Sequence, residues 1–169
     1  MNPMPVSFDL HSESYTYIMA LCMADAIGEQ SGLIRFEGPL GAGKSTWIRG
    51  MLRHWGWQSA IPSPTYSLLE CYTIGSRQIY HMDLYRIGDM EELTMLGLDQ
   101  LIQPALWLIE WSKPYSGTLL PVADLTLRLE YHEDDNSRRV DLTEHSSHGA
   151  HWIRRFLTHK DAACAKTPF

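Results

Sequence analysis

A glycine-rich motif of eight residues places the strongest constraint on what this chain can fold into. Residues 38–45 read Gly-Pro-Leu-Gly-Ala-Gly-Lys-Ser, which is a complete match to a phosphate-binding loop. The compact run of residues 33–37 before it has strand character, and residues 45–55 after it contain no helix breaker except Gly50. Because this loop binds phosphates where it joins a strand to a helix, the context predicts a nucleotide-binding α/β domain. The alternative is a glycine-rich turn that only precedes a helix.

The residue types of this motif each suit one task in phosphate binding. Glycines let the backbone curl so that successive amides point inward at a helix N-terminus, which attracts anions. Lys44 can reach the β- and γ-phosphate oxygens, and the hydroxyl of Ser45 is placed to ligate Mg²⁺. We therefore predict that ATP and Mg²⁺ bind here and that Lys44 is also catalytic. The predicted nucleotide-binding residues of this segment are Gly38, Leu40, Gly41, Ala42, Gly43, Lys44, Ser45 and Thr46.

A phosphate loop also needs an acid that holds the metal, and two carboxylates stand at suitable places. Glu110 ends the fully apolar run 105–109, and Asp83 ends the run 78–82. Both follow predicted strands, and ligands gather at the carboxyl ends of strands in α/β sheets. We predict that Glu110 joins Ser45 in the Mg²⁺ shell, directly or through water, and that Asp83 orients the attacking water or joins that shell. The alternatives are a turn-capping role for Asp83 and a surface position for Glu110.

The pattern of the remaining chain predicts a single α/β domain over residues 1–169. We expect a three-layer P-loop NTPase fold with a mostly parallel sheet and an inserted antiparallel pair around residues 67–84. Ser12 or Ser14 can cap the first helix, and the tail from about residue 157 is expected to be loosely ordered. Further strands are predicted at residues 6–10, 125–130 and 139–142, and short helices at 91–97 and 98–102.

Composition limits the classes of function. The chain has 169 residues of which 44% are apolar, enough for one core, and its net charge of −6 argues against a protein that mainly wraps nucleic acid. Cys22, Cys71 and Cys164 are far apart and form no CxxC pair, which indicates reduced thiols. The longest apolar stretch, residues 15–27, contains Asp25 and is too short to span a bilayer. No signal peptide is evident, so we expect a cytoplasmic protein without membrane contact.

Several motifs beyond the phosphate loop occur together in a fixed order. After residues 38–46 come Ser63-Pro64-Thr65-Tyr66, then His81-x-Asp83-Leu84-Tyr85-Arg86, then Glu92-Leu93 with Leu96-Gly97-Leu98, and finally Ile109-Glu110-Trp111. This combination, spread over residues 6–142, resembles the TsaE family, the small P-loop ATPases of bacterial tRNA threonylcarbamoyladenosine synthesis. A phosphate loop alone is shared by many kinds of protein, whereas the ordered set of motifs is far more specific.

The resemblance implies an ATPase that binds ATP·Mg²⁺ and assists the enzyme that installs threonylcarbamoyl on adenosine 37 of tRNAs reading ANN codons. Its implied partners are the catalytic subunit of the threonylcarbamoyl transferase and the non-catalytic paralogue of that subunit. The chain would reach tRNA through their complex. Hydrolysis, slow in the isolated protein, would license or reset the complex between turnovers.

The resemblance also implies roles for single residues. Thr65 belongs to a switch loop near the γ-phosphate, and Asp83 matches the acid needed for hydrolysis. Glu110 matches the metal-shell acid, and Trp111 is the aromatic residue beside it. Thr16 aligns with a threonine near the nucleotide base.

Two positions depart from the pattern of the family. Ser45 stands where threonine is common, and serine supplies the same hydroxyl. Ser112-Lys113-Pro114 follows Trp111 where the family tends toward proline and an acid, so no role is carried over to Lys113. The segment from His145 onward lies outside the motifs.

Two other functions remain open from the sequence. A small-molecule or nucleotide kinase would need a cluster of arginines after residues 109–111, where only the pair Arg138-Arg139 stands out, and these can instead pair with Asp134 and Asp141. A non-enzymatic binding module would use nucleotide occupancy only to control assembly.

Several histidines have two interpretations as well. His81 either belongs to the nucleotide site or packs under a strand end. His145, His148 and His151 fall three residues apart, as metal ligands could, but without a nearby acid or cysteine cluster a solvated helix face is favoured.

Overall fold

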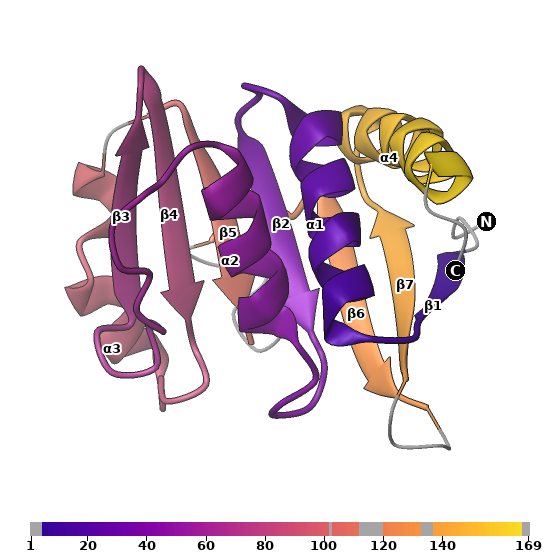
Figure 1. The fold of residues 1–169 in the computed structure, drawn as a ribbon. Helices are drawn as coiled ribbons and strands as arrows, with labels where there is room; N and C mark the ends of the chain where they lie inside the picture. The colour runs from indigo at the N-terminus through magenta and orange to yellow at the C-terminus, as the bar shows by residue number, and fades with distance from the viewer. Residues whose placement is uncertain (1–4, 102, 112–119, 133–136, 167–169) are drawn as a thin grey trace.

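Seven strands form one sheet in the computed structural model (Figure 1), which describes residues 5–101, 103–111, 120–132 and 137–166. The order of the strands across the sheet is β1-β7-β6-β2-β5-β4-β3, so β2 lies in the middle. Their bounds are Val6–Leu10 for β1, Gly32–Glu37 for β2, Leu69–Ile74 for β3, Arg77–Asp83 for β4, Ala105–Glu110 for β5, Leu125–Tyr131 for β6 and Arg138–Glu144 for β7.

The sheet is mixed, and its parallel part occupies the centre. β6, β2, β5 and β4 are parallel neighbours, whereas β3 pairs antiparallel with β4 at one edge. At the other edge β7 pairs antiparallel with both β6 and β1. The α/β class is confirmed, and the predicted antiparallel pair is the β3–β4 hairpin. The sheet is less parallel than the sequence predicted, because the β6–β7 hairpin turns back and β7 then pairs with a strand from the start of the chain.

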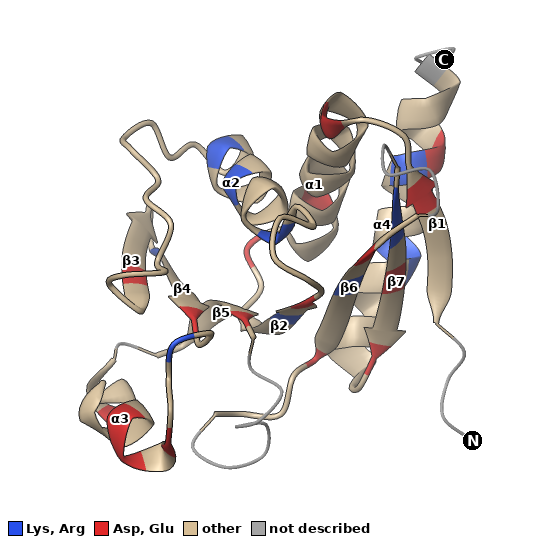
Figure 2. Cartoon of the chain, turned by 90° about the horizontal axis from the view of Figure 1, so that it is seen from below, with Lys and Arg blue, Asp and Glu red and all other residues tan. Residues whose placement is uncertain are grey.

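Helices cover the two faces of the sheet and create three layers (Figures 1 and 2). One face carries α1 (Glu13–Ile27), α2 (Lys44–His54) and α4 (Ser147–Lys166), with α1 packed between the other two. The other face carries α3 (Met90–Met95) and the short 3₁₀ helix η1 (Leu98–Gln100). Side chains alternate along each strand. In β2, Ile34 and Phe36 lie in the core cluster beneath α1, α2 and α4, and Leu33 lies in the cluster on the face that carries α3.

Both ends of α1 are fixed by local chemistry. The hydroxyl of Ser12 accepts a hydrogen bond from the Tyr15 amide at 3.1 Å, so Ser12, and not Ser14, is the N-cap. Gly28 follows the helix with φ 59°, a backbone conformation that favours glycine, and its amide donates to the carbonyl of Ala24.

The C-terminal segment differs from the sequence prediction. The tail from about residue 157 was expected to be loosely ordered, but α4 continues through it to Lys166. Trp152 and Phe156 are fully buried, and Leu157 and Ala163 pack against the same core. α4 packs along α1, and these tertiary contacts stabilise the helix.

Cys22, Cys71 and Cys164 all lie within the described residues and form no disulfide. None of the helices in the described ranges is long and apolar enough to cross a membrane.

Candidate functional site

The phosphate loop lies at the end of the sheet where the parallel strands have their C-terminal residues (Figure 2). Residues 38–43 connect the end of β2 to Lys44, the first residue of α2. Gly38, Gly41 and Gly43 adopt φ values of 135°, 76° and 106°, which other residues rarely adopt. A Cβ atom at Gly38 would also lie 2.1 Å from the carbonyl oxygen of Leu129. The loop therefore needs its glycines, and it places backbone at a helix N-terminus, where an anion is favoured.

Lys44 is buried within this loop, with 4% of its surface exposed. Its Nζ donates hydrogen bonds to the carbonyl oxygens of Gly38 at 2.8 Å and Pro39 at 2.9 Å. Burial lowers the pKa of the Lys44 ammonium, and the negative charges of Glu110 and Asp83 oppose that shift. The ammonium is thus held inside the curl of the loop, in the position from which it can meet phosphate oxygens.

Ser45 and Glu110 meet directly beside the loop. The Ser45 hydroxyl donates to the Glu110 carboxylate, with distances of 3.1 Å to Oε1 and 3.4 Å to Oε2. The parallel register places Glu110 next to Phe36 of β2 and next to Asp83 of β4. Glu110 is only 3% exposed, so the alternative of a surface position is excluded. The structure brings together the two residues that the sequence assigned to the metal.

Asp83 lies at the end of β4 and contacts Thr65, which the resemblance assigns to a switch loop. Its Oδ2 accepts a hydrogen bond from the Thr65 hydroxyl at 3.0 Å, and Thr65 in turn contacts the hydroxyl of Ser63 at 2.8 Å. Its Oδ1 accepts from the amide of Tyr85 at 3.0 Å. The turn-capping role is therefore real. It leaves further lone pairs on both carboxylate oxygens, because each oxygen can accept two hydrogen bonds.

Trp111 closes one side of the loop. Its ring lies under the ammonium of Lys44, with Nζ 4.1 Å from the ring centroid, and it contacts the ring of Tyr85 at a centroid distance of 5.0 Å. The residue has φ 60°, an uncommon value for a side chain of this size, and its amide donates to the carbonyl of Phe36. Lys113 and its two neighbours lie outside the described residues.

A cavity of about 400 Å³ adjoins the other side of the loop. Its walls include Thr16, Thr46, Gly41 and Gly43, so two of the predicted threonines face the same space. The Thr16 hydroxyl donates to the carbonyl of Ser12 at 3.0 Å. Thr16 thus lies beside the phosphate loop, and its place near the base of a nucleotide stays a prediction.

The long strands β6 and β7 also contribute to this side of the site. Arg138 lines the cavity and its guanidinium stacks over Tyr131 at 4.2 Å. The Tyr131 hydroxyl donates to the carbonyl of Leu40 at 2.6 Å, while the Leu40 side chain is 76% exposed. Arg139 instead pairs with Asp141 at 3.3 Å, and Asp134 lies outside the described residues.

The side chains at the loop fit a magnesium ion bound together with a nucleotide. Mg²⁺ prefers oxygen ligands and uses one or two protein side chains plus phosphates and water. Ser45 and Glu110 supply a hydroxyl and a buried carboxylate at one point. Among the described residues, no three or more histidine, cysteine or acidic side chains lie together in a group that could hold a metal ion.

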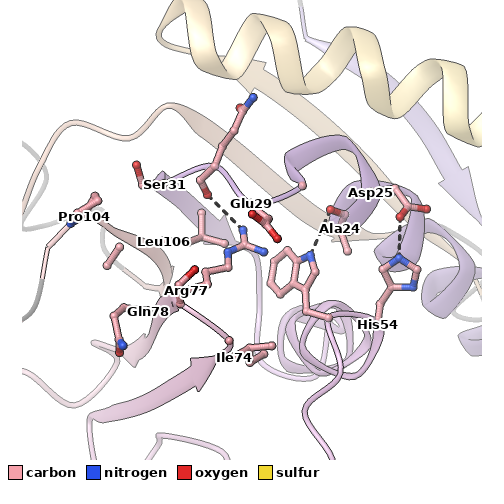
Figure 3. Close-up of a pocket in the computed structure, with 16 residues that line it drawn as sticks. Ala24, Asp25, Glu29, Ser31, His54, Ile74, Arg77, Gln78, Pro104 and Leu106 are labelled. Carbon is pink, nitrogen blue, oxygen red and sulfur yellow. Dashed lines mark hydrogen bonds and ion pairs between the residues drawn. The ribbon is translucent and has the colours of Figure 1, made fainter.

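A second cavity, of about 470 Å³, lies at the end of the sheet where β4 and β5 begin, opposite to the phosphate loop (Figure 3). It is bounded by the C-terminal ends of α1 and α2, where helix dipoles are negative, and by Asp25 and Glu29. Arg77 is the cation in it, and that guanidinium already stacks on Trp55 and donates to the carbonyl of Gln30 at 3.2 Å. A triphosphate therefore does not suit this cavity.

Some residues at the site were not assigned from the sequence. Ser12 and Glu13 line the cavity beside the loop, and Tyr131 contacts the loop backbone. His81 had been left between two interpretations, and its Nε2 lies 2.9 Å from Oε1 of Glu110. No local sequence pattern predicts these contacts, because each depends on how segments far apart in the sequence are placed in the fold.

The sequence of the chain is similar to those of known proteins. A family described as threonylcarbamoyl adenosine biosynthesis protein TsaE matches residues 10–140. The chain belongs to the TsaE family.

Two curated relatives carry the same name, "tRNA threonylcarbamoyladenosine biosynthesis protein TsaE". The one from Haemophilus influenzae is 40% identical over 129 residues, which cover 76% of this chain and 80% of the relative. The one from Rickettsia felis is 34% identical over 139 residues, covering 82% and 80%. The resemblance drawn from the motifs is confirmed.

The fold has a match among solved structures. The crystal structure of YdiB from Bacillus subtilis superposes with a TM-score of 0.76 at 24% identity, covering 94% of this chain and 97% of YdiB. The match with the TsaE family ends at residue 140, so most of β7 and all of α4 lie beyond it.

Proposed function

We propose that this chain is a Mg²⁺-dependent ATPase that is required for the formation of threonylcarbamoyladenosine at position 37 of tRNAs reading ANN codons. The observation that carries the proposal is the contact of 3.1 Å between the Ser45 hydroxyl and the buried carboxylate of Glu110, beside a complete phosphate loop. Membership of the TsaE family supports the role in tRNA modification.

The residues of the chain divide the work of binding and hydrolysis. The amides of residues 38–45 and the Lys44 ammonium hold the phosphates, and Ser45 with Glu110 would hold the metal ion. When bound, Mg²⁺ supplies a positive charge that offsets the charge of the phosphate oxygens. Asp83 accepts a proton from the attacking water through the lone pairs that Thr65 and Tyr85 leave available.

The proposal includes partners and a location. The catalytic subunit of the threonylcarbamoyl transferase and its non-catalytic paralogue are the partners, and tRNA is reached through their complex. Hydrolysis licenses or resets that complex between turnovers, and it takes place in the cytoplasm, where the tRNA substrate is found.

A kinase is a less suitable function for this site. Kinases of this size clamp two substrates with several arginines, whereas here Arg138 alone lines the cavity beside the loop and Arg139 pairs with Asp141. Buried Asp83 at the end of β4 favours hydrolysis over a plain binding switch, because a switch does not require a proton acceptor there.

The direct test measures phosphate release from ATP by the pure protein, alone and with the two transferase subunits. We expect slow release alone, stimulation by the subunits, and a loss of about tenfold or more in the stimulated rate for Glu110→Ala, since even a partner that only orients a metal ligand is worth about tenfold. Glu91→Ala removes an exposed carboxylate from α3 and should leave the rate unchanged. Full hydrolysis by the isolated protein without response to the subunits would overturn the proposal, as would transfer of phosphate to a nucleoside.

A second variant separates hydrolysis from binding alone. Asp83→Asn is expected to keep nucleotide affinity but to lower stimulated hydrolysis by about 10²-fold, because the amide cannot accept the proton of the attacking water. Isothermal titration with a non-hydrolysable ATP analogue and a phosphate-release assay measure the two effects. Asp99→Asn, an exposed change in η1, is the matched control. If Asp83→Asn protein hydrolyses ATP normally, the residue is only a turn cap.

A further inference from the structure

The buried side chain of His81 forms a hydrogen bond with Glu110, one of the two proposed metal ligands. His81 is 1% exposed and Glu110 is 3% exposed, and His81 Nε2 lies 2.9 Å from Glu110 Oε1. A carboxylate can only accept, so Nε2–H is the donor of this bond. Nδ1 of the same ring has no hydrogen-bond partner in the described part of the chain. The polar capacity of His81 is thus directed at one atom, the Oε1 oxygen of Glu110.

The sheet makes this contact possible. His81 lies opposite Leu108 in the parallel pair β4–β5, and Glu110 follows Leu108 by two positions on the same face. Diagonal neighbours on one face of a sheet are within reach of long side chains. Glu110 therefore receives a hydrogen bond from β4 on one side and from Ser45 of α2 on the other.

Without His81, the position of the Glu110 carboxylate would be poorly defined. Its only other side-chain hydrogen bond among the described residues comes from Ser45, at 3.1 Å and 3.4 Å, and Ser45 is itself a proposed metal ligand. His81 is not a proposed ligand, so its hydrogen bond fixes the carboxylate independently of any movement of Ser45 toward a metal ion. Side chains that orient a metal-binding carboxylate in this way strongly affect metal affinity.

We propose that His81 is a positioning residue that holds Glu110 in the orientation needed for Mg²⁺. This inference rests on the proposed nucleotide and metal site. His81 itself does not ligate the ion, because Mg²⁺ prefers oxygen and Nε2 is already directed to Glu110.

Three substitutions separate this role from simple core packing. In His81→Gln the amide nitrogen can occupy the place of Nε2 and donate to Glu110, whereas the shorter side chain of His81→Asn reaches only the place of Nδ1. His81→Met fills a similar volume to glutamine without any donor, and it serves if the asparagine variant does not fold. Thermal unfolding of each variant shows whether it is folded before binding is measured.

The measurement is the affinity for Mn²⁺ or Mg²⁺ in the presence of a saturating non-hydrolysable ATP analogue, by electron paramagnetic resonance or calorimetry. The affinity for the analogue in EDTA is measured in parallel. We expect His81→Asn and His81→Met to weaken metal affinity by about tenfold or more, and His81→Gln to stay close to the wild type. All three should bind the metal-free analogue as the wild type does.

The outcomes distinguish failure of the inference from failure of the proposed function. If the wild type binds no nucleotide, or if Mg²⁺ never affects binding, the proposed function fails. If the wild type depends on the metal but the folded asparagine or methionine variant keeps the same metal affinity, the positioning role of His81 is wrong. A parallel loss of metal affinity in all three variants, including glutamine, would also overturn it, since the donor would then not be the property that matters.

Discussion

Lys44→Ala is expected to lower kcat/KM for ATP hydrolysis by about 10²–10³-fold, the usual effect of removing a preorganised charged donor from a buried site. The Nζ atom is buried and held by the carbonyl oxygens of Gly38 and Pro39 inside the loop. Its charge is also balanced by Glu110 and Asp83, so the alanine variant brings phosphates toward two carboxylates without the cation between them. Steady-state phosphate release and calorimetric nucleotide binding measure the loss.

Arg49→Ala provides the matched control for this result. Arg49 carries the same charge on the same helix, but it is exposed to solvent. Its replacement should leave both binding and hydrolysis close to those of the wild type. If the two variants bound nucleotide equally well, the phosphate loop would not be the nucleotide site.

Gly149→Ala is expected to produce the largest loss of stability, about 3 kcal/mol in the free energy of unfolding, at the upper end of the usual cost of overpacking. A Cβ atom at this position would lie 1.9 Å from the carbonyl oxygen of Asp124, which is backbone and cannot rotate away. Asp124 accepts hydrogen bonds from the Leu33 amide and the Ser146 hydroxyl, so it ties β2 to the start of α4. The added methyl group would force this junction apart.

Urea denaturation measures the change in unfolding free energy, and a fall in Tm of about 6–12 °C would correspond to it in a chain of this size. Gly88→Ala is the control, because the nearest atom to a Cβ there is the end of a Glu92 side chain at 3.8 Å. A Gly149→Ala variant as stable as Gly88→Ala would show that α4 is not seated against Asp124 as described.

The phosphate loop and its acids could be predicted because their geometry follows from local sequence and a general rule of parallel sheets. Residues 38–45 fix their own conformation through glycine, and the ends of β2, β4 and β5 must meet at one edge. That rule brings Asp83 and Glu110 beside the loop without knowledge of any side-chain contact.

The contact of His81 with Glu110 needed information that the sequence does not display. It depends on the register of β4 against β5, in which one shifted residue would turn His81 to the other face. The role of Ser12 in both the helix cap and the cavity wall likewise depends on where α1 lies relative to the loop.

The C-terminal helix shows a limit of a different kind. Residues from 157 onward were expected to be loosely ordered because they lie at the end of the chain, but the apolar side chains of Trp152 and Phe156 pack against α1 and the sheet. Such stabilisation comes from packing between segments more than a hundred residues apart in the sequence.

The contacts of Lys44 also affect the balance between stability and function in this chain. Folding removes water from the ammonium before any nucleotide arrives, and two carbonyl oxygens and an indole ring only partly replace it. An incoming phosphate exchanges these partners for stronger ones and does not have to dehydrate the cation. The dehydrated ammonium therefore lowers the free energy of unfolding of the nucleotide-free chain. Because this dehydration is complete before binding, the same contribution raises the affinity for the nucleotide.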